Sequence, residues 1–162
     1  MITYESFGFL KEGGVFAALA GIYAEYPFHD VEQKTAWEGN WKEYDRLLFS
    51  NMDTVGKAGF VSVLDGRMIG FCSWDPRGAP RSVIVGHNGL LPAYRGFGYG
   101  SGQIRRMLEI FRERGYVTAT VTTGDEDFFV PAQRMYAACG FTETRRFLQD
   151  GCRQIEYLLR LR

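Results

Sequence analysis

Hydrophobic and polar positions along this chain follow two periods, and the clearest example lies in its second half. Ser82–Leu91 is an apolar run typical of a buried strand, and a glycine-rich turn follows it. Beyond the turn, apolar residues recur at i, i+3, i+4 and i+7, as on one face of a helix: Ile104, Met107, Leu108 and Phe111. Gly115 predicts the end of that helix, and the β-branched residues of Val117–Thr123 predict another strand. We therefore expect a strand–helix–strand unit with parallel strands.

Two Asp-Gly pairs predict tight hairpins, because such turns need residues that tolerate a positive φ. They are Asp65-Gly66 and Asp150-Gly151. The expected strand pairs around them are Gly59–Leu64 with Met68–Trp74 and Thr142–Leu148 with Arg153–Leu161. The remaining elements are expected to be a strand at Ile2–Ser6 and helices at Gly14–Tyr26, Val31–Phe49 and Pro131–Cys139. Pro27 is expected to end the first of these helices and Gly140 the last.

The turn after Ser82–Leu91 carries the most specific chemistry of the chain. From Arg95 to Gly100 it reads R-G-F-G-Y-G, with glycine at every second position just before a helix. Glycine leaves backbone N–H groups unobstructed and a helix N-terminus adds partial positive charge, so the segment predicts a cradle for a phosphate or pyrophosphate. The spacing is not that of a dinucleotide fingerprint, because the sixth position counted from Gly96 is Ser101. The G-K-[ST] triplet of a P-loop does not occur either.

Two motifs around this cradle resemble those of a known family. L-L-P-A-Y-R-G-F-G-Y-G-S resembles the acetyl-coenzyme A signature of the GNAT superfamily of N-acyltransferases, and P-A-Q-R-M-Y-A-A-C-G-F resembles its second motif. The resemblance covers Gly59 to Arg162 well and the earlier residues by general layout. It implies one α/β (α+β) domain over residues 1–162, with a mixed, mostly antiparallel sheet, a central splayed parallel strand pair and flanking helices. It also implies N-acetyltransferase activity with acetyl-coenzyme A (acetyl-CoA) as the acyl-donor cosubstrate.

The resemblance implies that the cosubstrate binds to two neighbouring segments. Gly89, Leu90 and Leu91 would bind the pantetheine arm and polarise the acetyl carbonyl, as an oxyanion hole does; the alternative is a plain buried strand. Gly86 and Gly89 within this strand also suggest a bulge or a close ligand approach. The pyrophosphate would lie on the turn, where the implied contacts are Arg95, the backbone amides of Gly96, Phe97, Gly98, Tyr99 and Gly100, and Ser101. Arg105 and Arg106 are either contacts for the 3′-phosphate or solvated surface residues.

One position departs from the family pattern. Members commonly carry an asparagine three residues before the motif alanine, and here Phe129 stands three residues before Ala132. The contact of that asparagine with the cosubstrate is therefore missing or replaced. Phe128-Phe129 is expected to form a hydrophobic wall or staple instead.

Amide formation needs a neutral amine as nucleophile and a proton for the departing thiolate. The second motif implies Tyr136 as the acid, because a phenol with a pKa of about 10 can protonate a thiolate whose thiol titrates near about 8.5. Tyr136 also fits a core position on its helix. His87 has the intrinsic pKa of a general base, although a lone strand histidine is more often structural. Asp125 and Glu126, at the carboxyl end of a strand, are the alternatives for binding or deprotonating the amine.

The resemblance implies that the acceptor amine binds near the first two helices and their connection. Tyr26 and Phe28 belong to an aromatic-rich stretch that suits a small amine with apolar bulk, through cation–π contacts. The alternative is that these rings only pack the helices onto the sheet. A small-molecule amine and a protein amine both remain as acceptors.

Composition limits the other functions. The 162 residues, 46% of them hydrophobic, are enough for one domain with a continuous core. A net charge of zero without a basic cluster disfavours a nucleic-acid partner. Cys72, Cys139 and Cys152 lack the spacing of a metal site, and with only two histidines no metal is expected. The N-terminus has no signal-peptide pattern and no apolar run approaches about 20 residues, so we expect a cytoplasmic protein without membrane contact. The sequence leaves a homodimer open.

The mechanism expected from these residues is direct transfer in a ternary complex, because none of them resembles an activated acyl-enzyme nucleophile. The competing hypothesis is a non-catalytic module that binds an acyl-coenzyme A as a sensor. A nucleotide-binding domain is disfavoured by the missing fingerprints.

Overall fold

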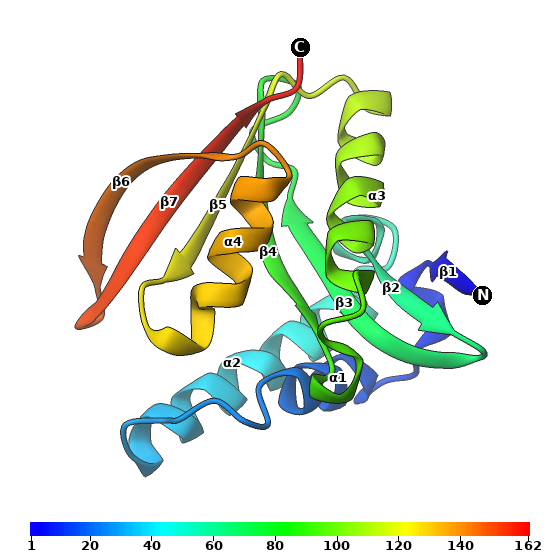
Figure 1. The fold of residues 1–162 in the computed structure, drawn as a ribbon. Coiled ribbons are helices and arrows are strands. Elements are labelled where there is room, and N and C mark those ends of the chain that lie inside the picture. Colours follow the sequence, from blue (N-terminus) through cyan, green and yellow to red (C-terminus); the bar gives the residue numbers. More distant parts are fainter. The chain divides into compact units, whose positions relative to one another are not determined.

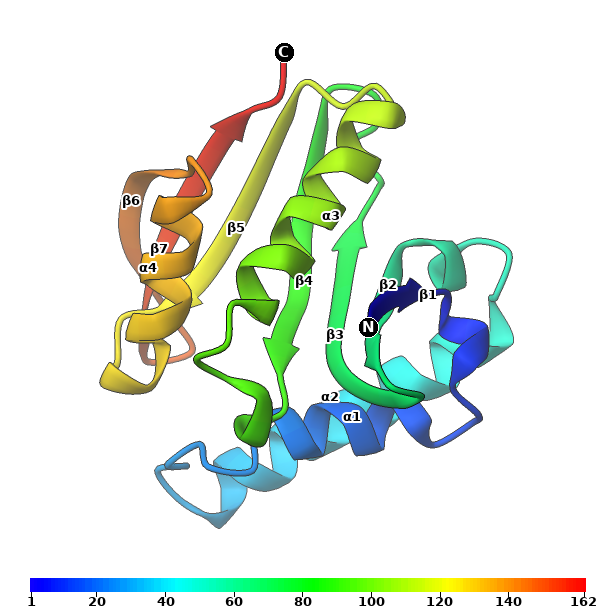
Figure 2. The same cartoon turned by 45° about the vertical axis from the view of Figure 1, so that its right-hand side comes forward.

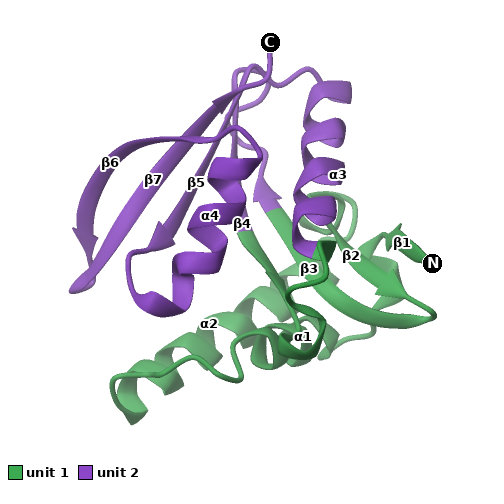
Figure 3. Cartoon of the chain, viewed as in Figure 1, with its two compact units in different colours: residues 1–73, 87–99 green, residues 74–86, 100–162 purple.

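The computed structural model describes residues 1–162, whose contacts group into two compact units (Figure 3). Unit 1 comprises residues 1–73 and 87–99, and unit 2 comprises residues 74–86 and 100–162. The helices are α1 (Gly14–Ile22), α2 (Val31–Ser50), α3 (Tyr99–Glu113) and α4 (Val130–Ala138), and the strands are β1 (Ile2–Glu5), β2 (Gly59–Leu64), β3 (Arg67–Asp75), β4 (Ser82–Leu90), β5 (Thr118–Gly124), β6 (Thr142–Gln149) and β7 (Cys152–Arg160) (Figure 1). Short 3₁₀ helices, which the sequence pattern did not predict, lie at Phe7–Phe9, Val55–Lys57, Pro92–Tyr94 and Asp127–Phe129.

The strands form one sheet in the order β1-β2-β3-β4-β5-β7-β6. The pairs β1–β2, β2–β3, β5–β7 and β6–β7 are antiparallel, and β4–β5 is parallel. The parallel register covers Ser82–Val85 against Thr118–Val121, and both strands continue beyond it, β4 to Leu90 and β5 to Gly124. The expected mixed, mostly antiparallel sheet with one parallel pair is confirmed.

Both predicted hairpins are present because their turn residues adopt the conformation that the sequence favours. Asp65 and Gly66 have φ of 50° and 81°, and Asp150 and Gly151 have φ of 51° and 76°. Positive φ at both central residues is the requirement of the two-residue turn that matches strand twist. The hairpins therefore follow from local sequence alone.

Helix α1 ends earlier than its sequence pattern predicts. The expected helix ran to Tyr26, but α1 stops at Ile22. The Tyr26 amide donates to the Tyr23 carbonyl in a tighter turn, at 3.0 Å. The Ile22 carbonyl, which a continued helix would offer to that amide, accepts a hydrogen bond from the Arg95 side chain instead. A tertiary contact thus sets this helix end.

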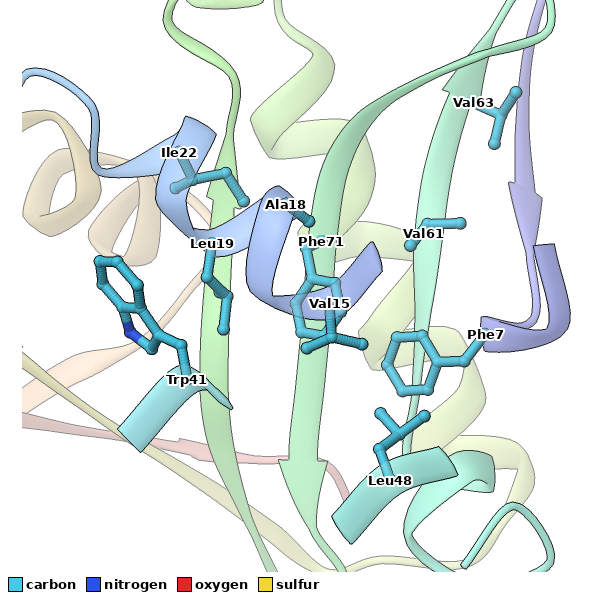
Figure 4. Packing of buried hydrophobic residues seen from close by; sticks show 10 residues of the cluster. All are labelled: Phe7, Val15, Ala18, Leu19, Ile22, Trp41, Leu48, Val61, Val63 and Phe71. Carbon is cyan, nitrogen blue, oxygen red and sulfur yellow. The ribbon is translucent and has the colours of Figure 1, made fainter. Parts of the chain in front are cut away.

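The core of unit 1 lies between α1, α2 and the inner face of β2 and β3 (Figure 4). Phe7, Val15, Leu48 and Phe71 are fully buried there, and the rings of Phe7 and Phe71 stack at 4.9 Å. Helices α1 and α2 lie side by side in both views of the chain (Figures 1 and 2). This packing holds α1, whose far end reaches the end of β4.

The core of unit 2 combines one face of α3 with the sheet. The four apolar residues that the pattern assigned to this face are all at most 3% exposed, and the rings of Trp74 and Phe111 meet edge to face at 5.1 Å. Gly115 and Gly140, with φ of 83° and 97°, follow α3 and α4 as predicted. Helix α4 lies against β7, where the rings of Tyr136 and Tyr157 are 6.1 Å apart.

Candidate active site

The end of β4 lies in close contact with the C-terminal end of α1 in unit 1. A Cβ placed on Gly89 would come within 2.6 Å of Ile22 Cγ2, and one on Gly21 would come within 2.8 Å of Leu91 Cδ2. The sequence had suggested a bulge or close ligand approach at Gly89. The structure shows that the element closely approaching this glycine is a helix.

Arg95 joins this helix end to the glycine-rich turn. Its Nη2 donates to the carbonyl of Ile22 at 2.6 Å and to the carbonyl of Leu90 at 3.2 Å. A guanidinium is well placed at a helix C-terminus, where unpaired carbonyls carry partial negative charge. The structure therefore shows Arg95 holding the turn to α1 and β4, and its contact with a phosphate stays a prediction.

The turn itself has the backbone of an anion cradle. Gly96 and Gly98 have φ of 84° and 86°, a conformation that side-chain-bearing residues rarely adopt, and space is open where their Cβ atoms would be. The amides of Tyr94 and Arg95 donate to carbonyls of the preceding turn, whereas those of Gly96, Phe97 and Gly98 bond to no carbonyl of the chain. Successive unpaired amides at the start of a 15-residue helix suit a pyrophosphate. Gly100 and Ser101 continue the segment as part of the first turn of α3.

His87 faces aromatic rings in unit 1. Its ring lies 5.3 Å from that of Tyr44 and 6.4 Å from that of Phe71, and its amide donates to Ser73 Oγ at 3.0 Å. This apolar burial lowers the pKa of His87 from 6.5 to about 4. The imidazole is therefore neutral at pH 7 and weaker as a base than the sequence suggested.

The burial of His87 predicts a loss of stability in acid. Its pKa is lower in the folded than in the unfolded chain, so the unfolded chain binds more protons as the pH falls from about 6.5 to about 4. We expect His87 to lower the free energy of unfolding by about 3 kcal/mol between pH 7 and pH 4. Urea unfolding of wild type and of His87→Gln at both pH values measures this difference. His29→Gln, which replaces an exposed histidine, is the control, and an equal acid loss in wild type and His87→Gln would contradict the prediction.

Tyr26 and Phe28, predicted to contact the acceptor, lie in an aromatic cluster between α1 and α2. Tyr26 is 5% exposed and stacks on Trp37 at 4.7 Å, and the Phe28 ring meets both rings edge to face at 4.8 and 5.3 Å. The rings thus cover one another, as the packing alternative predicted. Phe28 and Trp37 remain partly exposed and keep an accessible edge.

An open groove of about 670 Å³ lies beside the root of the cradle in unit 1. Its lining includes Glu25, Arg67, Leu91 and Tyr94. Of the predicted site residues, it contains Leu91 alone.

Unit 2 carries the other predicted site residues on α4 and the end of β5. Tyr136 is 3% exposed, and its ring contacts that of Phe141 edge to face at 5.6 Å. Asp125 and Glu126 directly follow β5, and the Asp125 amide donates to the Arg153 carbonyl at 3.2 Å. The units therefore separate the predicted residues into two groups, with Gly100, Ser101, Asp125, Glu126 and Tyr136 in unit 2 and the rest in unit 1.

The structure shows what stands where the family pattern has an asparagine. The ring of Phe129 covers Gly124, where a Cβ would lie 2.6 Å from Phe129 Cδ2. One helical turn later, Gln133 Nε2 donates to the Gly124 carbonyl at 2.9 Å. The hydrophobic wall expected of Phe129 is thus formed against β5. The Gln133 carboxamide was missed by the sequence analysis, although its i+4 spacing from Phe129 placed it on the same helix face.

The three cysteines are free thiols. Burial raises the pKa of Cys72, and burial also raises that of Cys139 against the opposing charge of Arg105. Both thiols are therefore protonated at neutral pH, which makes them poor nucleophiles.

No group of three or more His, Cys, Asp or Glu side chains is placed to hold a metal ion. None of the helices has both the length and the apolar character needed to span a membrane.

Comparison with known proteins shows the family of the chain. The model of the acetyltransferase (GNAT) family matches residues 16–141, so the chain belongs to this family. Membership confirms the resemblance seen in the sequence and the expected enzyme class, an acetyl-CoA-dependent acyltransferase. None of the curated protein sequences matches this chain.

Solved structures share the fold over nearly the whole chain. The ribosomal-protein-S18-alanine N-acetyltransferase of Escherichia coli is 17% identical, with 99% of this chain and 94% of that chain covered and a TM-score of 0.69. YncA of Salmonella typhimurium, solved with its cofactor acetyl-CoA, is 16% identical, with coverage of 99% and 94% and a TM-score of 0.65. An N-acetyltransferase of Staphylococcus aureus Mu50 is 14% identical, with coverage of 100% and 99% and a TM-score of 0.69. At these identities the likeness establishes the fold.

Proposed function

We propose that this chain transfers the acetyl group of acetyl-CoA to a primary amine by direct attack in a ternary complex. The observation that carries the proposal is the cradle: unpaired amides between two positive-φ glycines, at the start of α3, in a member of the GNAT family. We further propose that the 162 residues act as one cytoplasmic catalytic domain. The family match, which includes residues of both units, supports the single domain.

The cosubstrate contacts proposed here follow the chain. The amides from Gly96 to Gly100, with Ser101, hold the pyrophosphate. The backbone of Gly89–Leu91 holds the pantetheine arm and the acetyl carbonyl, except for the Leu91 amide, which already donates to the Ile69 carbonyl at 2.8 Å. Arg95 fixes the turn through the two carbonyls that it binds. In unit 2, Gln133 donates through Nε2 to the Gly124 carbonyl, and its Oε1 keeps the capacity to accept a hydrogen bond.

Tyr136 is proposed to give the departing thiolate its proton, and the amine is proposed to attack the thioester without an acyl-enzyme. The protonated state of Cys72 and Cys139 supports direct attack, because neither offers a thiolate at neutral pH. For the base, the low pKa of His87 favours Asp125 or Glu126, or an amine that arrives neutral.

The acceptor is an amine, either a small molecule or a protein. A protein acceptor is supported by two fold neighbours, the ribosomal-protein-S18-alanine N-acetyltransferase and the NatC complex bound to Gag peptide. The partly exposed aromatic edges of Phe28 and Trp37 support an acceptor with apolar bulk beside its amine.

Thiol release from acetyl-CoA tests the proposal. Purified protein is incubated with acetyl-CoA and a panel of small amines and peptides, and free coenzyme A and the acetylated product are both quantified. We expect at least one amine to give equimolar thiol and product, with intersecting double-reciprocal kinetics as in a ternary complex. Selective acetyl-CoA binding with no release for any amine would instead support the sensor module, and parallel lines would indicate an acyl-enzyme. The same assay on His87→Ala and Glu126→Ala identifies the base through the pH–rate profile.

A further inference from the structure

Phe97 is an exposed aromatic residue in the middle of the cradle. Its side chain is 72% exposed, the largest exposed fraction of any ring among the exposed large hydrophobic residues of the chain. It stands between Gly96 and Gly98, and its ring lies 6.3 Å from that of Tyr99, tilted by 42°. Two aromatic rings thus stand at alternate positions on the segment whose backbone amides are unpaired.

The root of the turn is held by hydrogen bonds, so the backbone that carries Phe97 is anchored. The amides of Tyr94 and Arg95 bond to the carbonyls of Leu91 and Pro92 at 3.0 and 3.3 Å. The Arg95 side chain binds two further carbonyls, of Ile22 and Leu90. An exposed ring in a turn with a fixed root presents a stable apolar face to solvent.

The chemistry of that face differs from the chemistry of the cradle around it. A phenyl ring cannot donate a hydrogen bond to a phosphate, so it adds nothing to anion binding. It offers a flat surface on which a nucleobase can stack, whatever the identity of the base. A ligand that joins a pyrophosphate to a planar base satisfies both features at once, and acetyl-CoA carries adenine next to its pyrophosphate.

We propose that Phe97 is the stacking platform for the adenine ring of bound acetyl-CoA. This inference rests on the proposed function and adds to it a residue that recognises the nucleotide end of the cosubstrate. Phe97 is then a specificity residue: it favours the complete cosubstrate over acyl donors that lack the base. Phe97 contacts neither the acetyl group nor the amine.

Three acyl donors separate the adenine contact from the other contacts. Acetyl-CoA has both the adenine and the 3′-phosphate, acetyl-3′-dephospho-coenzyme A keeps the adenine alone, and acetyl-4′-phosphopantetheine has neither. Calorimetric titration gives the Kd of each donor for wild type, Phe97→Ala and Phe97→Trp. We expect Phe97→Ala to raise the Kd of the two adenine-bearing donors about tenfold and equally, and to leave that of acetyl-4′-phosphopantetheine unchanged. Phe97→Trp is expected to retain the wild-type Kd for all three.

The control is Leu148→Ala, which removes an equally exposed apolar side chain (71%) from β6 and should change no Kd. Wild-type protein that fails to bind acetyl-CoA would contradict the proposed function itself. Wild-type binding with no change in Phe97→Ala would overturn the stacking proposal alone and would mean that the ring faces something other than the cosubstrate. An equal loss for all three donors would also overturn it, because Phe97 would then act on the shape of the cradle.

Discussion

Replacing Tyr136 by phenylalanine is expected to lower kcat about a hundredfold while the Kd of acetyl-CoA changes less than about threefold, because general acid catalysis contributes factors of this size. The variant removes one hydroxyl and keeps the ring. The edge-to-face contact with Phe141 at 5.6 Å and the contact with Tyr157 at 6.1 Å both remain. A fall in kcat in a variant that unfolds at the same urea concentration as wild type would therefore report the lost proton donor and not a disturbed helix α4.

Tyr157→Phe is the matched control. Tyr157 is 7% exposed, lies on β7 and packs against Tyr136, so its variant removes a neighbouring hydroxyl from the same environment. We expect kcat of Tyr157→Phe within about twofold of wild type, since only a positioned acid gives the larger factor. Wild-type kcat in Tyr136→Phe would remove Tyr136 from the mechanism and leave it as a core residue. Steady-state kinetics with a saturating amine, together with calorimetric Kd values, measure both parameters.

The second large effect is expected on stability, from Asp45→Ala. Asp45 is a 7% exposed carboxylate on α2 that caps the N-terminus of α1. Oδ1 accepts the amide of Gly13 at 2.9 Å, and Oδ2 accepts those of Val15 and Phe16 at 2.8 and 3.0 Å. Gly13 precedes α1 without a side chain that could cap it, so the carboxylate comes from another helix.

Alanine at position 45 would leave the buried Val15 amide and the partly buried amides of Gly13 and Phe16 without this acceptor, and it would remove a negative charge from a helix N-terminus. We expect the free energy of unfolding to fall by about 3 kcal/mol. Asp30→Ala is the control: Asp30 caps α2 through a single 2.7 Å bond to the Gln33 amide at an exposed site, and about 1 kcal/mol is expected there. Urea unfolding measures both variants. If Asp45→Ala lowers the free energy of unfolding no more than Asp30→Ala does, the cap formed by Asp45 is not needed for stability.

The elements of this fold were predictable where the signals are local. The Asp-Gly turns, the amphipathic face of α3 and the glycines after α3 and α4 each depend on residues within a few positions of one another, and each was found where expected. The predicted end of α1 was wrong by four residues. Pro27 was expected to end the helix, but the Ile22 carbonyl binds Arg95, which lies far along the chain, and α1 stops there. No local pattern around Ile22 contains that information.

The candidate site shows the same division. The cradle is visible in the sequence because its three glycines alternate within one short segment of the chain. The cap formed by Asp45 and the contact of Gln133 with Gly124 were not visible in the sequence, since each joins segments that only the fold brings together. The weak basicity of His87 was equally hidden, because it comes from Tyr44 and Phe71 on other elements.

The binding of acetyl-CoA to the cradle is the central claim, and calorimetric titration tests it most directly. Protein freed of co-purified ligand is titrated with acetyl-CoA, and NAD and ATP serve as controls because they carry adenine and phosphates without the pantetheine arm. We expect saturable one-to-one binding of acetyl-CoA that is at least tenfold tighter than binding of either control, about 1.4 kcal/mol or more. Folded protein that binds no acetyl-CoA, or binds all three alike, would contradict it.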